Sequence, residues 1–145
     1  MSRQPLVSVI TATYQMGQYV SRAVDSVLEQ DYPEVESIVV NDGSTDDTRE
    51  VLSKYDDDSR VTVIHQENAG QTVAKNRGLA AARGALIGFC DADNYWLPGK
   101  LDRQVPVLAA RPEVGVVYGQ IAMIDGEGNP LPPPRTRRYS GRITG

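Results

Sequence analysis

Short apolar segments rich in Val and Ile recur along the chain, and segments with a helical spacing of apolar residues separate them. The apolar segments predict five strands, at residues 7–12, 37–40, 61–65, 85–90 and 114–119. The first four alternate only weakly between apolar and polar positions, which is typical of strands buried on both faces of a parallel sheet. We therefore expect most of the sheet to be covered on both sides.

The segments between the strands predict four helices. In residues 19–28 apolar side chains recur at helical spacing, and Tyr32-Pro33 ends this helix. Similar patterns predict helices over residues 48–55, 72–83 and 99–110, with Gly84 as the C-cap of the third and a kink at Pro106 in the last. This alternation predicts right-handed βαβ units, and thus an α/β fold with a mostly parallel sheet flanked by helices.

Length and composition fit a single globular domain. The chain has 145 residues, of which 40% are hydrophobic and 23% charged. The net charge of −4 argues against binding nucleic acid through a broadly basic surface. We find no signal peptide pattern and no membrane span, and the lone Cys90 cannot form an internal disulfide. We expect a cytoplasmic protein, with a position at the membrane face open for a longer form.

The composition changes near residue 129. Four prolines lie within residues 130–134, four arginines follow within residues 135–142, and no acidic residue comes after Glu127. Such a sequence has too little apolar surface to offset the entropy of ordering. We expect one domain over residues 1–128, and an extended or mobile tail over residues 129–145.

Candidate chemistry lies just after the strands, because ligands of open parallel sheets bind at the carboxyl ends of the strands. Asp42 follows the second strand, and Asp91 and Asp93 follow the fourth. Two acids at alternate positions of an extended chain point to the same side and repel each other unless a cation lies between them. If the first strand lies between the second and fourth, Asp42 is roughly 10 Å from this pair. A nucleoside diphosphate could span that distance, with a divalent cation on Asp93 bridging to its phosphates.

Simpler interpretations exist for each of these residues. Acids at strand ends are often only solvated, and Asp-Gly favours tight turns. Ser44 and Asp47 are the better candidates for capping the helix that follows, which leaves Asp42 free. His65 lacks partners for a zinc site, and we expect it to be a surface or hydrogen-bonded residue. The glycine motifs of dinucleotide-binding and P-loop proteins are absent.

A series of short motifs, in this order, resembles the family 2 glycosyltransferases of GT-A fold. The motifs are Val7-Ser8-Val9-Ile10 with Thr13-Tyr14, Asn41-Asp42-Gly43-Ser44, Asn68-Ala69-Gly70, Lys75-Asn76-Arg77-Gly78 and Asp91-Ala92-Asp93. The resemblance implies that Asp42 contacts the nucleotide base, that Thr13 and Tyr14 form the wall of the base and ribose pocket, and that Lys75 lies near the donor.

The resemblance also implies a metal site and a reaction. Asp91 and Asp93 match the DxD motif, with Asp93 the expected direct ligand of Mg²⁺ or Mn²⁺ and Asp91 closer to the ribose. The donor would be a nucleotide-diphosphate sugar, with a UDP-sugar favoured, and its sugar would pass with inversion to an acceptor that is a saccharide, lipid or protein. Ala12, Gln15 and Asn41 depart from the family pattern, which has Pro, Asn and Asp there.

The catalytic residue cannot be named from this sequence. Members of the family continue well past this length, and their catalytic base lies in the later half. We therefore expect this chain to be the donor-binding part, with the tail leading into an acceptor-binding half. Two alternatives remain: a non-catalytic module that binds nucleotide sugars or a partner, and a metal-dependent nucleotidyltransferase. The second would need a glycine-rich, basic loop after the first strand, which Thr11 to Gln15 do not provide.

Overall fold

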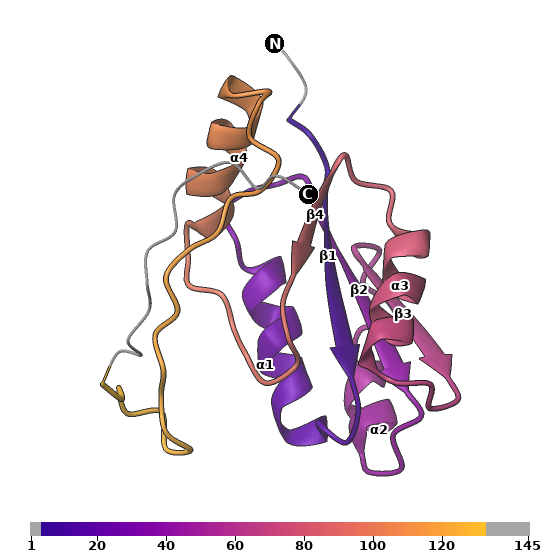
Figure 1. Ribbon diagram of the computed structural model, residues 1–145. Helices are drawn as coiled ribbons and strands as arrows, with labels where there is room; N and C mark the ends of the chain where they lie inside the picture. Colours follow the sequence, from indigo (N-terminus) through magenta and orange to yellow (C-terminus); the bar gives the residue numbers. More distant parts are fainter. Residues whose placement is uncertain (1–3, 133–145) are drawn as a thin grey trace. The chain divides into compact units, whose positions relative to one another are not determined.

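The computed structural model describes residues 4–132 and contains one parallel sheet of four strands. The strands are β1 (Val7–Thr13), β2 (Val35–Asp42), β3 (Val61–Gln66) and β4 (Leu86–Phe89), in the spatial order β3-β2-β1-β4. β1 thus lies between β2 and β4, which is the condition for Asp42 to lie near Asp91 and Asp93. All arrows in Figure 1 run the same way, so the ends of β1, β2 and β3 meet at one edge.

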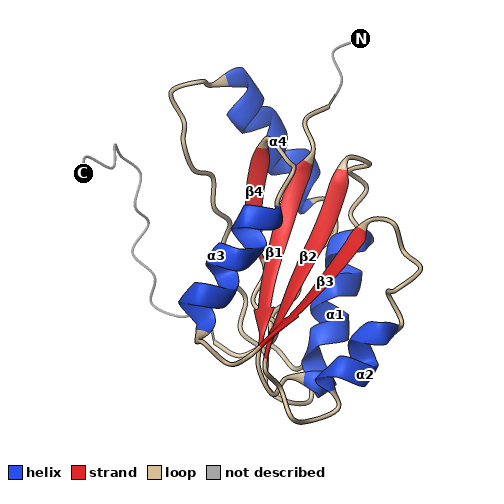
Figure 2. Cartoon of the chain, turned by 90° about the vertical axis from the view of Figure 1, so that its right-hand side faces the viewer, coloured by secondary structure: helices blue, strands red, loops and turns tan. Residues whose placement is uncertain are grey.

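Four helices connect or follow the strands: α1 (Gly17–Leu28), α2 (Thr48–Ser53), α3 (Gln71–Ala81) and α4 (Lys100–Ala110). Figure 2 shows α3 on one face of the sheet, with α1 and α2 on the other. Alternate residues of β1 point to opposite faces: Val7 and Val9 pack with α1, whereas Ala12 packs with Ala74 of α3. The α/β fold and a parallel sheet flanked by helices are confirmed. Burial on both faces holds for β1 and β2, whereas residues of β3 and β4 are only half-buried or exposed.

Gly84 does not cap α3, contrary to the prediction. The helix ends at Ala81, and Ala82 already has extended backbone angles. A Cβ on Gly84 would lie 2.6 Å from the backbone nitrogen of Ser8 and 2.7 Å from the carbonyl oxygen of Leu6. Glycine is therefore required here by the close approach of this loop to β1.

The predicted fifth strand at residues 114–119 is wrong for the described chain, in which this segment has no strand structure. The chain divides into two compact units, one up to Pro106 and one from Val107. In the described part of the second unit, an isolated bridge joins Ile124 to Pro130. Val116 and Tyr118 are each 67% exposed, so the alternating pattern buries neither side chain; a strand also needs a hydrogen-bonded neighbour.

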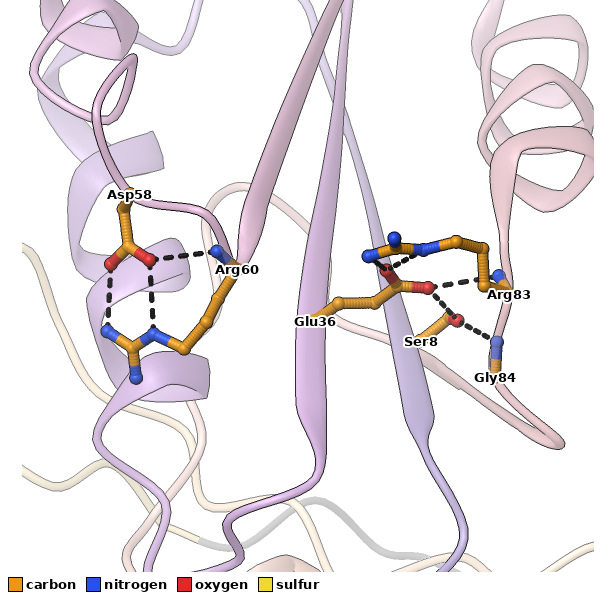
Figure 3. A network of polar contacts seen from close by, with 6 residues as sticks. All are labelled: Ser8, Glu36, Asp58, Arg60, Arg83 and Gly84. Carbon is orange, nitrogen blue, oxygen red and sulfur yellow. Dashed lines mark hydrogen bonds and ion pairs between the residues drawn. The ribbon is translucent and has the colours of Figure 1, made fainter.

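A buried carboxylate ties the amino end of the sheet to the loop after α3 (Figure 3). Glu36 of β2 accepts hydrogen bonds from the hydroxyl of Ser8 at 2.6 Å and from the backbone amide of Arg83 at 3.0 Å. The guanidinium of Arg83 also donates to Glu36, with Nε at 2.8 Å. Ser8 accepts in turn from the amide of Gly84. This network lies at the end of the sheet opposite the strand-end loops.

Arg60 forms a local ion pair with Asp58, also drawn in Figure 3.

No helix among residues 4–132 is long and apolar enough to cross a lipid bilayer. The four arginines of the predicted tail and its last two prolines, Pro133 and Pro134, lie outside the described residues.

Candidate functional site

A pocket of about 500 Å³ lies at the carboxyl edge of the sheet and draws its walls from the ends of all four strands. Its lining consists of Ala12, Thr13, Tyr14, Met16, Asp42, Asn68, Gly70, Gln71, Asp91, Ala92 and Asp93. Five of the six predicted site residues are in this set, and the sixth, Lys75, contacts Asp91. Asp42 and Asp93 therefore face one cavity from opposite sides of β1.

The third strand contributes walls that sequence reasoning did not assign. Asn68, Gly70 and Gln71 follow β3 and line the pocket, although only the ends of the other three strands were considered for chemistry. The rule that ligands bind at strand carboxyl ends applies to β3 equally, and it was the signal that could have found them.

Asp42 is buried at the end of β2, where three donors hold its carboxylate. Oδ1 accepts from Nε2 of Gln66 at 2.7 Å and from the amide of Ala69 at 2.9 Å, and Oδ2 accepts from the amide of Gly70 at 2.9 Å. Burial by itself would raise the pKa of Asp42, but these hydrogen bonds outweigh it and hold the pKa below its ordinary value. Asp42 therefore stays ionised and fixed in the pocket wall.

Thr13 and Tyr14 offer different surfaces at the end of β1. The hydroxyl of Thr13 is buried and has no hydrogen-bond partner within residues 4–132. Buried polar groups are normally paired, and Thr13 lines the pocket, although this oxygen itself is shielded from solvent. The Tyr14 ring is 49% exposed and forms an open aromatic wall.

Asp91 and Asp93 are not equivalent. Nζ of Lys75 lies 2.8 Å from Oδ1 of Asp91 in a partly exposed ion pair. The carboxylate of Asp93 has no hydrogen-bond or ion-pair partner in the described chain. Asp93 is thus the acid that can accept a cation without first losing a protein partner.

These residues fit a cation that a ligand helps to hold, and not an all-protein metal centre. Among the residues that the structure describes, no group of three or more His, Cys, Asp or Glu side chains is placed to hold a metal ion. Mg²⁺ commonly uses one or two carboxylates and completes its shell with water and substrate phosphates. The free carboxylate of Asp93 meets that requirement.

Asp46 binds the first amides of α1 and α2, and the predicted caps Ser44 and Asp47 do not cap α2. Oδ1 of Asp46 accepts from the amide of Thr48 at 3.1 Å, and Oδ2 accepts from the amide of Gly17 at 3.1 Å. Asp47 precedes α2 but makes no capping hydrogen bond through its side chain. His65 is exposed, with Nδ1 3.3 Å from the side-chain nitrogen of Asn41, as expected for a hydrogen-bonded surface residue.

A second hollow, of about 450 Å³, lies beside α1 and is lined in part by Arg22, Asp25 and Tyr95. The guanidinium of Arg22 lies 3.7 Å from the centre of the Tyr95 ring. Trp96, which follows, packs against the apolar cluster between α1 and the sheet. None of the predicted site residues lines this hollow.

The sequence model of Glycosyl transferase family 2 matches residues 8–144. The chain belongs to glycosyl transferase family 2. It is 38% identical over 130 residues to TuaG of Bacillus subtilis strain 168, a glycosyltransferase named for teichuronic acid biosynthesis; the match covers 88% of this chain and 51% of TuaG.

Solved structures of glycosyltransferases share the fold. TarS 1-349 of S. aureus in complex with UDP-GlcNAc matches with a TM-score of 0.67 and 30% identity, over 72% of this chain and 31% of that chain. The mannosyltransferase PcManGT from Pyrobaculum calidifontis in complex with GDP-Man and Mn²⁺ matches with a TM-score of 0.60 and 31% identity, over 66% of this chain and 29% of that chain. The chain therefore spans about half of the length of TuaG and less than a third of these two chains.

Proposed function

We propose that this chain binds the nucleotide-diphosphate sugar of a glycosyltransferase, in the pocket at the carboxyl edge of the sheet. The observation that carries the proposal is that Asp42 and Asp93 line one cavity together with Thr13 and Tyr14. The complexes of two structural neighbours with UDP-GlcNAc and GDP-Man support a nucleotide sugar as the ligand.

We assign the base to the Asp42 end, and the hydrogen bonds of Asp42 favour uracil. A carboxylate has about four lone-pair sites, and protein donors use two on Oδ1 and one on Oδ2. One acceptor site is left, on Oδ2. Uracil presents a single N3–H donor on its pairing edge, whereas guanine presents N1–H and an amino group. Uracil, or thymine with the same edge, therefore matches the remaining acceptor better than guanine does.

We assign the diphosphate to the Asp93 end. A diphosphate and a carboxylate repel, so Asp93 would hold Mg²⁺ or Mn²⁺, which when bound supplies positive charge to the phosphate oxygens. The Mn²⁺ in the PcManGT complex supports this choice of ion. Lys75 forms an ion pair with Asp91 at 2.8 Å, which lowers the negative charge that the donor meets. Asp91 would accept a hydrogen bond from the ribose.

We further propose that transfer inverts the sugar and that its base comes from outside these residues. The acceptor oxygen would form a bond to the anomeric carbon while the bond from that carbon to the diphosphate breaks, and a base would take the acceptor proton. Asp125 is a poor candidate, because hydrogen bonds from Asn129, Glu127 and Gly128 lower its pKa. Residues 1–128 would form the donor-binding domain and residues 129–145 would lead into an acceptor-binding part.

Calorimetric titration of the chain with UDP, GDP, dTDP and ADP, each with and without Mn²⁺, tests the proposal. We expect UDP and dTDP to bind more tightly than GDP and ADP, with tighter binding when Mn²⁺ is present. Asp42→Asn should weaken UDP binding by at least about tenfold, because the amide presents a donor to the amides of Ala69 and Gly70. Absence of binding to all four nucleotides would refute donor binding by this chain.

A further inference from the structure

Gln15 joins the loop after β1 to the turn after β2 through four hydrogen bonds. Its side-chain Oε1 accepts from the amides of Thr45 at 2.8 Å and Asp46 at 3.0 Å, and its Nε2 donates to the hydroxyl of Thr45 at 2.9 Å. Its backbone amide donates to Oγ of Ser44 at 2.9 Å. One residue thus satisfies two backbone amides and two hydroxyls across the gap between the loops.

The backbone of Gln15 is in the left-handed region, with φ of 55°. This is the one non-glycine residue with positive φ in the described chain. A side chain raises the energy of this conformation, so it persists only where surrounding contacts favour it. The hydrogen bonds to residues 44–46 are contacts of that kind, and Gln15 has few others because it is exposed.

The two loops that Gln15 joins follow adjacent strands whose ends line the pocket. Tyr14 directly precedes Gln15, and Asp42 directly precedes the turn that Gln15 holds. Asp42 is fixed by its own three hydrogen bonds, but Tyr14 has a half-exposed ring, and no hydrogen bond of its hydroxyl is recorded among residues 4–132. The position of Tyr14 therefore depends on the backbone that carries it.

We propose that Gln15 is a positioning residue that sets nucleotide affinity by holding the β1–α1 loop, and with it Tyr14, against the turn after Asp42. The inference rests on the proposed binding of the nucleotide in this pocket. Gln15 itself does not line the pocket, so it acts through Tyr14 and not by touching the nucleotide. A nucleotide then meets a wall that is already ordered, which avoids the entropy of ordering the loop on binding.

Two substitutions separate the hydrogen bonds of Gln15 from its backbone conformation. Gln15→Met keeps the length of the side chain and the energetic cost of the left-handed backbone. It removes the three side-chain hydrogen bonds. Gln15→Gly removes the same bonds and also the left-handed cost. Gln18→Met is the matched control, since Gln18 is an exposed glutamine on the first turn of α1. Hydrogen exchange, thermal unfolding and calorimetric titration with UDP and Mn²⁺ are measured for all four proteins.

We expect Gln15→Met and Gln15→Gly to bind UDP about tenfold more weakly than the parent chain, and Gln18→Met to bind it unchanged. The amides of Thr45 and Asp46 should exchange faster in both Gln15 variants. Gln15→Gly should unfold at a higher temperature than Gln15→Met, so that affinity does not follow stability.

Three outcomes would overturn this role. The first is that Gln15→Met binds UDP as tightly as the parent chain. The second is that Gln15→Gly does so, which is the result expected if Gln15 has a purely structural role. Unchanged exchange of the Thr45 and Asp46 amides in both variants is the third. If the parent chain binds no nucleotide, the proposed function itself fails, and the role of Gln15 fails with it.

Discussion

Nζ of Lys75 lies 2.8 Å from Oδ1 of Asp91, whereas Asp93, two residues further on, has no side-chain partner in the described chain. The two acids therefore start from different states. Asp91 is neutralised by the protein, and Asp93 keeps an uncompensated charge at the rim of the same pocket. This difference separates their expected responses to substitution.

Asp93→Asn should abolish the effect of Mn²⁺ on UDP affinity, because it removes the free carboxylate that would hold the ion. Asp91→Asn should weaken UDP binding less and keep the Mn²⁺ effect. Titration with UDP, with and without Mn²⁺, measures both, and Asp57→Asn, at an exposed position outside the pocket lining, is the control. A full Mn²⁺ effect in Asp93→Asn would place the ion elsewhere.

Lys75→Met should weaken UDP binding by about tenfold, because it leaves the charge of Asp91 uncompensated where the diphosphate is expected. The difference in UDP affinity between this variant and the parent chain should be smaller at high salt. Stability should change by less than about 1 kcal/mol, since both side chains of this pair are partly exposed.

Lys54→Met is the matched control for Lys75→Met. Lys54 forms a similarly exposed ion pair, 3.1 Å from Asp25, and does not line the pocket. Titration with UDP at low and high salt, together with urea unfolding, gives both quantities. Equal UDP affinities in the two variants would contradict a role for Lys75 near the donor.

Local periodicity predicted the order of strands and helices, because each of these elements buries one face or both and its spacing records that burial. The predicted site residues also met, because parallel strands bring their carboxyl ends to one edge. Links through long polar side chains leave no such periodic signal. Gln15 reaches an amide 30 positions away and Gln30 reaches one 70 positions away, so neither role could be predicted from spacing.

The failed predictions have local causes of their own. Residues 114–119 have the pattern of a strand, but pairing is a property of two segments and not of one. A glycine directly after a helical segment is typical of a helix C-cap, which is why Gly84 was expected to cap α3. In the structure Gly84 has no side chain to clash with β1, which allows its loop to pack closely against that strand.

Glu36 should make the stability of the chain depend on pH. Burial alone would raise the pKa of Glu36, but the hydrogen bonds from Ser8 and Arg83 outweigh it and hold the pKa below the ordinary value of 4.5. A group whose pKa is lower in the folded than in the unfolded state stabilises the protein when the pH is above its unfolded-state pKa. This stabilisation is lost as the pH falls through the folded-state pKa. The free energy of unfolding should therefore decline as the pH is lowered from 4.5.

Glu36→Gln should lower the free energy of unfolding at pH 7 by about 1–3 kcal/mol, because the amide keeps some of the hydrogen bonds but loses the charge. The difference in free energy of unfolding between the variant and the parent chain should become smaller at acidic pH. Urea unfolding across the pH range measures this, with the exposed Glu50→Gln as the control. A gap that stays constant down to the lowest pH would show that ionisation of Glu36 contributes nothing.

Gln30→Ala should destabilise the chain by about 2–3 kcal/mol. The buried Gln30 side chain accepts from the amides of Lys100 and Leu101 at 3.0 and 3.2 Å, which caps α4, and donates to the carbonyl oxygen of Leu97 at 3.1 Å. Removing it leaves these groups without their partners, so the amides of Lys100 and Leu101 should exchange faster. Gln18→Ala, at an exposed position on α1, should change stability by less than about 0.5 kcal/mol.

Gly84→Ala should be more harmful than Gly78→Ala, although both glycines are closely packed. A Cβ on Gly84 would meet backbone atoms of Leu6 and Ser8, which cannot move without disturbing β1. A Cβ on Gly78 would meet a methyl group of Ile10 at 2.6 Å, and a side chain can adjust more easily than a strand. We expect losses of about 1–3 kcal/mol for Gly84→Ala, a smaller loss for Gly78→Ala, and almost none for Gly115→Ala, where no atom lies within 4 Å. Urea unfolding ranks the three variants; a Gly84→Ala protein as stable as the parent chain would mean that Gly84 is not needed for the contact with β1.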